Sequence, residues 1–225
     1  MRIDILTLFP EMFAPLQTSL LGKATENNLI EINIINIRDY SKDKHKKCDD
    51  YTYGGGSGML MTPQPIYDAM TSIKGYKKAH KIYMSPKGKT YNQEMVKSLT
   101  NFDHLILLCG HYEGVDQRII DLLIDEEISI GDYVLTGGEL PAMVVVDSVA
   151  RYLPNVLGNS ESVVDESFSS GMLEYPQYTR PAEFMGLKVP EVLISGDHGK
   201  VDAWRKAQAE IETKNKRPDL LKNKK

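Results

Sequence analysis

The chain has 225 residues, of which 41% are hydrophobic and 26% charged, and its formal net charge at pH 7 is −4. A chain of this size and composition can bury a core in one or two ordinary globular domains. It has no apolar segment near the ~20 residues that span a bilayer, and its two cysteines are too few for a disulfide framework or a four-ligand zinc site, so we expect a cytoplasmic protein without membrane contact.

Apolar runs of strand length alternate with helix-like segments along the first 150 residues. Strands are predicted over residues 3–9, 30–37, 81–84, 105–109 and 127–130, and helices over residues 11–26, 65–73, 93–99, 115–124 and 142–153. Asn92 and Asp116 have the side chains that cap helices. This alternation predicts an α/β fold, with a mostly parallel sheet and helices on both faces.

The composition changes near Gly158, where polar residues without periodicity begin. We predict an α/β domain over residues 1–157, a flexible linker over residues 158–171, and a small helical domain over residues 172–225. An amphipathic helix over residues 197–216 carries the only tryptophan. Basic residues gather in residues 42–47 and in the tail from residue 214, and each run alone is typical of a solvated surface.

Glycine-rich loops follow three consecutive predicted strands, in residues 85–88, 110–114 and 131–138. Carboxyl ends of parallel strands are where open α/β sheets bind ligands, so the three loops together predict one pocket. No lysine follows to hold a triphosphate, and the spacing is not Gly-x-Gly-x-x-Gly. The expected ligand is therefore flat and mostly uncharged.

The chain resembles the bacterial tRNA (guanine-N1)-methyltransferases, the TrmD family of knotted SPOUT-class methyltransferases. The segments that carry this resemblance run in order through the whole chain, and they are residues 53–59, 109–114, 129–141, 175–181 and 217–220. The resemblance implies a C-terminal trefoil knot in the α/β domain and a homodimer whose active sites are shared between subunits. It also implies methyl transfer from S-adenosylmethionine to N1 of the guanine immediately 3′ of the tRNA anticodon, position 37.

By resemblance, the cofactor pocket takes backbone groups and apolar side chains from the strand-end loops. The residues implied are Tyr83, Met84, Ser85, Pro86, Gly110, Tyr112, Gly114, Ser129, Ile130, Gly131, Asp132, Tyr133, Val134, Leu135, Gly137, Gly138 and Pro141. Ile130 and Leu135 would pack on the two faces of the adenine. Without the resemblance, Ile130, Val134 and Leu135 would be read as core residues.

The resemblance also implies catalytic residues. Arg151 would lie near guanine O6, although an arginine at a helix edge is otherwise a snorkelling surface residue. Glu113 would place the cofactor or a magnesium ion, and no metal ligand set is assigned. The family's general base directly precedes a Ser-Phe pair, which here puts Glu166 in register and Asp165 one residue earlier. Residue type favours Asp165, but register favours Glu166, and we predict Glu166.

The partners implied are tRNA and a second copy of the chain. The RNA contacts predicted are Lys44, His45, Asp50, Glu174, Tyr178, Arg180, Lys214, Lys216 and Arg217, and Tyr51 or Tyr53 could stack on a base. Two alternatives are a non-catalytic tRNA-binding protein with a remnant pocket and a knotted methyltransferase for another RNA. The intact pocket loops disfavour the first, and residues 175–181 disfavour the second.

Overall fold

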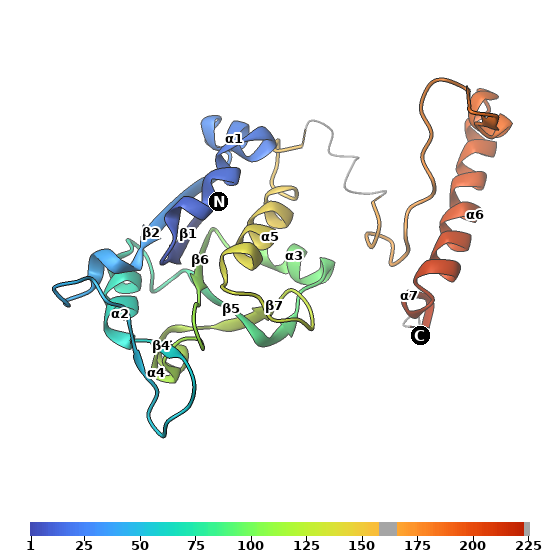
Figure 1. The fold of residues 1–225 in the computed structure, drawn as a ribbon. Coiled ribbons are helices and arrows are strands. Elements are labelled where there is room, and N and C mark those ends of the chain that lie inside the picture. Colours follow the sequence, from blue (N-terminus) through green and yellow to red (C-terminus); the bar gives the residue numbers. More distant parts are fainter. Residues whose placement is uncertain (158–165, 223–225) are drawn as a thin grey trace. The chain divides into compact units, whose positions relative to one another are not determined.

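The structure is a computed structural model that describes residues 1–157 and 166–222. The chain divides into two compact units, Met1–Gly158 and Asn159–Lys225 (Figure 1). No helix among the described residues is both long enough and apolar enough to cross a membrane.

Unit 1 is built on a five-stranded sheet in which every described pairing is parallel (Figure 1). The strand order is β2-β1-β6-β5-β7, and the strands are β1 (Arg2–Thr7), β2 (Glu31–Asn36), β5 (His80–Thr90), β6 (His104–Cys109) and β7 (Glu126–Ser129). Residues 105–109 of the central strand are buried, as a continuously apolar parallel strand should be. The predicted α/β class and parallel sheet are confirmed.

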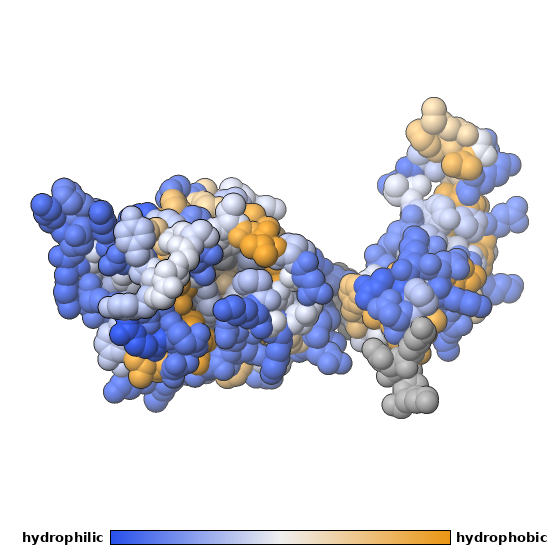
Figure 2. All heavy atoms as spheres, turned by 60° about the horizontal axis from the view of Figure 1, so that its bottom comes forward, coloured by the Kyte–Doolittle hydropathy of each residue, from blue (hydrophilic) through white to orange (hydrophobic). Residues whose placement is uncertain are grey.

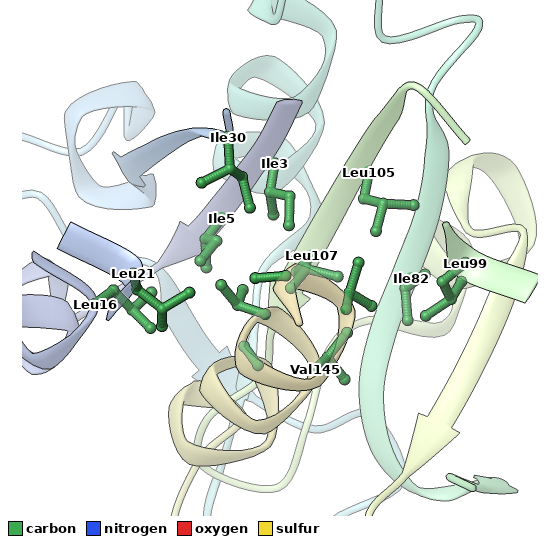
Figure 3. Close-up of a cluster of buried hydrophobic side chains, with 14 of the residues drawn as sticks. Ile3, Ile5, Leu16, Leu21, Ile30, Ile82, Leu99, Leu105, Leu107 and Val145 are labelled. Atoms are coloured by element: carbon green, nitrogen blue, oxygen red, sulfur yellow. The ribbon is translucent and has the colours of Figure 1, made fainter. Parts of the chain in front are cut away.

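Helices cover both faces of this sheet because alternate strand residues point to opposite sides. The helices are α1 (Ser19–Glu26), α2 (Pro63–Ser72), α3 (Gln93–Leu99), α4 (Gln117–Leu123) and α5 (Glu139–Ala150). Leu105 and Leu107 belong to a core cluster with α1, α3 and α5, and Figure 3 shows Val145 of α5 in it. Ile106 and Leu108 belong to the opposite cluster, with α2 and α4.

Capping residues begin two of these helices as predicted. The Asn92 carboxamide oxygen accepts hydrogen bonds from the backbone N–H groups of Glu94 and Met95, each at 3.0 Å. Asp116 caps α4 by accepting from the N–H of Arg118 at 3.0 Å. Both caps satisfy amides that have no partner inside the first helical turn.

The single helix predicted over residues 11–26 is wrong. The structure has a 3₁₀ helix, η1 (Pro10–Gln17), then Thr18 in an extended conformation at φ −116° and ψ 167°, and then α1. Pro15 lies inside η1, and its ring removes the amide hydrogen that a continuous α-helix would use. The apolar period continues through both helices, so the pattern alone did not indicate the break.

Three other short elements of unit 1 have no counterpart in the predicted elements. Strands β3 (Asp49–Tyr51) and β4 (Met59–Met61) pair antiparallel, so the glycine-rich residues 53–58 connect two strands of a ribbon. The 3₁₀ helix η2 (Ile37–Tyr40) follows β2. In addition, β5 continues to Thr90, and its pairing with β7 shifts register between Met84 and Lys89, so residues 85–88 loop out of the sheet.

Unit 2 is organised around the long helix α6 (His198–Lys216). Thr213 is fully buried, and its hydroxyl oxygen accepts a hydrogen bond from the Leu173 N–H at 2.9 Å. The Arg205 guanidinium lies 5.0 Å from the centroid of the Tyr175 ring. Among the described residues, this unit also contains β8 (Glu183–Phe184), β9 (Leu187–Lys188), η4 (Glu191–Ile194) and α7 (Asp219–Lys222). Figure 2 shows a largely hydrophilic surface on both units, with small separate hydrophobic patches.

Candidate functional site

A pocket lies at the carboxyl ends of β6 and β7, beside the interruption of β5 between Met84 and Lys89. Its walls are residues 83–87, 110–115, 127–131 and 133–138, with Gln117, Ile120 and Pro141. The three predicted strand-end loops therefore meet at one place, as expected for neighbouring parallel strands. Every residue predicted to bind the cofactor lines this pocket except Asp132, which is exposed on the loop and is not among the lining residues.

Backbone contacts hold two of the loops together at the pocket floor. The Gly138 N–H donates to the Gly110 carbonyl at 2.8 Å, and His111 and Gly137 form an antiparallel bridge. A β-carbon at residue 138 would lie 2.8 Å from Cys109 Cα and 3.0 Å from the Gly110 nitrogen. Gly138 has φ −83°, so glycine is needed there for close backbone approach and not for a left-handed conformation.

Tyr83 forms another part of the floor with its buried side chain. A β-carbon at Gly110 would lie 2.7 Å from the Tyr83 hydroxyl oxygen. Burial, followed by the nearby Glu127 carboxylate, raises the pKa of Tyr83 to about 12, against a hydrogen bond from the Val115 backbone. The phenol is therefore neutral at physiological pH, which suits a pocket for an uncharged ring.

Polar lining residues that sequence reasoning missed are Lys87, His111, Gln117, Glu127 and Thr136. Most of them had a signal in the pattern. Glu127 alternates with the buried Ile128 along β7 and pairs in register with Tyr83, so it shares a face with a predicted pocket residue. Lys87, His111 and Thr136 lie within the three loops predicted to form the pocket, whereas Gln117, at the start of α4, has no such signal.

A buried polar contact lies beside the pocket floor. Glu139, in the first turn of α5, is only 2% exposed, and the Thr7 hydroxyl at the end of β1 donates to its Oε1 at 2.8 Å. Burial, and then the Glu139 charge, raises the pKa of the Cys109 thiol well above its usual value. A β-carbon at Gly137 would collide with the Glu139 carboxylate. This contact joins β1, α5 and the pocket loop.

Glu113 lines the pocket, as the resemblance implies for a residue that places the cofactor or a magnesium ion. Its carboxylate also lies against Gly58, where a β-carbon would be 2.5 Å from Glu113 Oε1. Within the described residues, no group of three or more His, Cys, Asp or Glu side chains could hold a metal ion.

Arg151 is not part of the pocket within one chain. It caps the carboxyl end of α5, whereas Gly138 caps the amino end. Pro141, which lines the pocket, precedes Arg151 by ten residues, and this corresponds to about 15 Å along a helix, at 1.5 Å per residue. An arginine side chain is too short for that distance, so the predicted catalytic arginine and the pocket of its own chain lie apart.

The remaining predicted site residues lie at other places. Lys44, His45 and Asp50 are exposed in unit 1, before and within β3. Those in unit 2 are Glu166, Glu174, Tyr178, Arg180, Lys214, Lys216 and Arg217. The Arg217 guanidinium is paired with Asp219 at 2.7 Å, and Lys216 is paired with Glu212. Asp165 lies outside the described residues. The roles of all these residues stay predictions.

Comparison with known proteins gives a consistent result over the full chain. A family model described as "tRNA (Guanine-1)-methyltransferase TrmD" matches residues 1–223. Proteins named tRNA (guanine-N(1)-)-methyltransferase match from three bacteria: Ruminiclostridium cellulolyticum at 59% identity, Oceanobacillus iheyensis at 57% and Clostridioides difficile at 55%. These alignments cover 98%, 98% and 99% of this chain and 96%, 91% and 98% of the respective relatives.

Proposed function

The chain belongs to the tRNA (guanine-N(1)-)-methyltransferase family, and we propose that the pocket at the carboxyl edge of its sheet binds S-adenosylmethionine. The chain is a methyltransferase that acts on N1 of a guanine in tRNA. The observation that carries the cofactor proposal is the meeting of three loops around a floor of bare backbone at Gly110 and Gly138.

The residues present fit this cofactor. Backbone N–H and C=O groups in the loops can read the edge of an adenine, and Ile130 and Leu135 line the pocket with apolar surface. The glycines leave space that a β-carbon would fill. The bound cofactor supplies a methyl group on a sulfonium centre. The chain's own task is to hold that centre in line with guanine N1 and to exclude other geometries.

Removal of the N1 proton is the second task. We propose that the Glu166 carboxylate accepts this proton, so that the N1 electron pair is free to form the bond to the methyl carbon. Asp165 is the alternative base. Arg151 would stabilise the negative charge that develops on guanine O6 as the proton leaves. For magnesium, Glu113 is the residue that would hold the ion, whose charge would offset developing negative charge.

The proposal includes a homodimer with shared sites. Arg151 lies about 15 Å along α5 from Pro141, which lines the pocket of its own chain, and this separation supports a site completed by the arginine of a second copy. We also propose the trefoil knot of the family. The Gly138-to-Gly110 hydrogen bond and the His111–Gly137 bridge support it, since they hold the two loops of such a knot against each other.

The proposed target nucleotide is guanine 37. The exposed lysines of residues 42–47 and the basic tail would bind the tRNA phosphates. The proposed location of the reaction is the cytoplasm. The test is to incubate the protein with methyl-labelled S-adenosylmethionine and a tRNA transcript, digest the RNA, and identify the labelled nucleoside. We expect 1-methylguanosine, and none from a transcript with adenine in place of guanine 37. Label in another nucleoside, or undiminished label in the substituted transcript, would contradict the proposal.

A further inference from the structure

Tyr91, which directly follows β5, joins the pocket strand β7 to helix α5. Its backbone N–H donates to the carbonyl of Ser129, a pocket residue at the end of β7, at 2.7 Å. Its hydroxyl oxygen lies 2.8 Å from Ser148 Oγ in α5. The Ser148 hydroxyl itself donates to the carbonyls of Val144 at 2.7 Å and Val145 at 3.1 Å. Its one hydrogen is therefore committed to the helix, and the Tyr91 hydroxyl is the donor of the bond between the two side chains.

The Tyr91 hydroxyl keeps its proton at physiological pH. Burial raises the pKa of Tyr91 to about 12, and the hydrogen bond with Ser148 only partly opposes this effect. A neutral phenol in a partly buried position is a dependable donor, because little water competes for its hydrogen.

This bond reaches the last turn of α5. Ser148 lies three residues before Arg151, and residues at this spacing are neighbours on one side of a helix. The backbone holds this turn weakly, since the Arg151 N–H lies a long 3.3 Å from the Asp147 carbonyl oxygen. A second side chain holds it from the adjacent helix α3 (Figure 1), where Gln93 donates to the Tyr152 hydroxyl at 2.5 Å. Side chains outside α5 thus fix the turn that carries Arg151.

We propose that Tyr91 is a positioning residue that holds Arg151 where the shared active site needs it. Because Arg151 lies far from the pocket of its own chain, Tyr91 of one chain would serve the pocket of the second copy. The inference rests on the function proposed above, in which this arginine stabilises the charge on guanine O6. A displacement of about 1 Å at such a group can slow a reaction about a hundredfold, so the loss of one hydroxyl should be measurable in the rate.

The first test removes only the hydroxyl. Tyr91→Phe keeps the ring and the backbone N–H that binds Ser129, so the pocket of its own chain stays intact. We expect single-turnover methyl transfer to slow at least about tenfold. The dissociation constants of tRNA and of S-adenosylhomocysteine, which carries no methyl group to transfer, should stay within about twofold of the wild-type values.

Ser148→Ala removes the other side of the same bond. It should slow methyl transfer as much as Tyr91→Phe does, and the double variant should be no slower than either single variant. Tyr40→Phe is the matched control, because the Tyr40 hydroxyl accepts a hydrogen bond from Ser72 Oγ at 2.9 Å between η2 and α2, beside the opposite core cluster. Its methyl-transfer rate should equal that of the wild-type chain.

Mixed dimers show which site Tyr91 serves. Two affinity tags isolate dimers in which one chain carries Gly138→Ala and the other has an intact pocket. The cofactor is kept well below the dissociation constant of the Gly138→Ala pocket, so that only the intact pocket reacts. Tyr91→Phe in the Gly138→Ala chain should slow the reaction, because that chain supplies the arginine. Tyr91→Phe in the chain with the intact pocket should leave the rate of the mixed dimer unchanged.

The proposal is overturned if the slower rate follows the chain with the intact pocket, if both arrangements are slowed equally, or if neither is slowed. Equal slowing in Tyr40→Phe, or weaker S-adenosylhomocysteine binding in Tyr91→Phe, would overturn it as well. Arg151→Ala in the same two arrangements separates this failure from failure of the proposed function. If only the inference is wrong, Arg151→Ala still slows the reaction from the Gly138→Ala chain alone. If the shared site is wrong, Arg151→Ala does not show that pattern either.

Discussion

At the residue scale, glycines set the shape of the pocket because they carry no β-carbon. We predict that Gly138→Ala weakens S-adenosylhomocysteine binding at least about tenfold, because its β-carbon would press on backbone atoms of Cys109 and Gly110 that cannot rotate away. Calorimetric titration of a folded variant measures this. The control is Gly199→Ala, whose β-carbon would make only an ordinary contact at 3.6 Å, in α6. Wild-type affinity in Gly138→Ala would contradict the proposed pocket floor.

Tyr83 predicts a pH dependence of stability. Its pKa is about 12 when folded and 10.0 when exposed, because burial, followed by Glu127, disfavours the phenolate. The neutral Tyr83 phenol therefore contributes to the free energy of unfolding. This contribution is fully present below pH 10 and is lost as pH rises through 12, since the phenol ionises first in the unfolded chain. A difference of about two between the pKa values of the folded and unfolded chain corresponds to on the order of 2–3 kcal/mol in the free energy of unfolding.

Urea unfolding at pH 9 and at pH 11.5 gives the measurement. The free energy of unfolding of the wild-type chain should fall more steeply between these values than that of Tyr83→Phe, which has no phenol to ionise. The comparison between the two chains removes the effect of the many lysines that titrate in the same range. Parallel curves would show that the Tyr83 phenol is not protected from ionisation.

The general base is the sharpest test at this scale. Glu166→Gln should slow single-turnover methyl transfer by roughly 10²–10⁴-fold, because the amide keeps the shape of the carboxylate but cannot accept the proton. Binding of both substrates should barely change, and higher pH should partly restore the rate because guanine N1 then ionises unaided.

Variants at the neighbouring positions are its controls. Asp165→Asn should lower the methyl-transfer rate only slightly. Glu166→Asp should keep substantial activity, because its carboxylate occupies the same position in the sequence. An inactive Asp165→Asn beside an active Glu166→Gln would assign the base to Asp165 instead.

At the scale of elements, the Thr7–Glu139 hydrogen bond joins the first strand to the helix that begins at the pocket. Thr7→Val keeps the shape of the side chain but leaves the buried carboxylate without this donor and the Phe9 N–H without the hydroxyl that accepts it at 2.9 Å. We expect a loss of about 1.5–3 kcal/mol in the free energy of unfolding, as for a hydrogen bond to a charged group.

Thr18→Val is the matched control, because its hydroxyl donates to the Pro15 carbonyl in an exposed position. The free energy of unfolding of that variant, measured by urea denaturation, should stay within about 0.5 kcal/mol of the wild-type value. Equal losses in the two variants would mean that burial of Glu139 adds nothing to the strength of its hydrogen bond.

At the scale of the whole molecule, the distance between Arg151 and its own pocket predicts complementation. Arg151→Ala should be nearly inactive alone, and Gly138→Ala should have low activity when the cofactor concentration is kept well below the dissociation constant of that variant. A mixed dimer has one site with an intact pocket and the other chain's intact arginine, so a one-to-one co-expression should recover about a quarter of wild-type activity.

Light scattering should give twice the 25.3 kDa chain mass for every chain in this experiment. If each site were built within one chain, the mixed dimer would stay inactive. An active monomer would likewise contradict a shared site.

The sequence alone predicted most of the elements of unit 1 and the place of its pocket. Local periodicity determines strands and helices, side-chain chemistry determined the caps at Asn92 and Asp116, and parallel strands bring their carboxyl ends to one edge. The resemblance then identified the family, which the full-length matches confirm.

Only the tertiary structure decided which distant residues touch. Thr7 and Glu139 are separated by 132 positions, and the contacts of Gly58 with Glu113 and of Gly138 with Gly110 also join segments far apart in the chain. Periodicity records which face of an element is apolar, whereas these contacts depend on the close approach of whole elements, for which local sequence carries no signal.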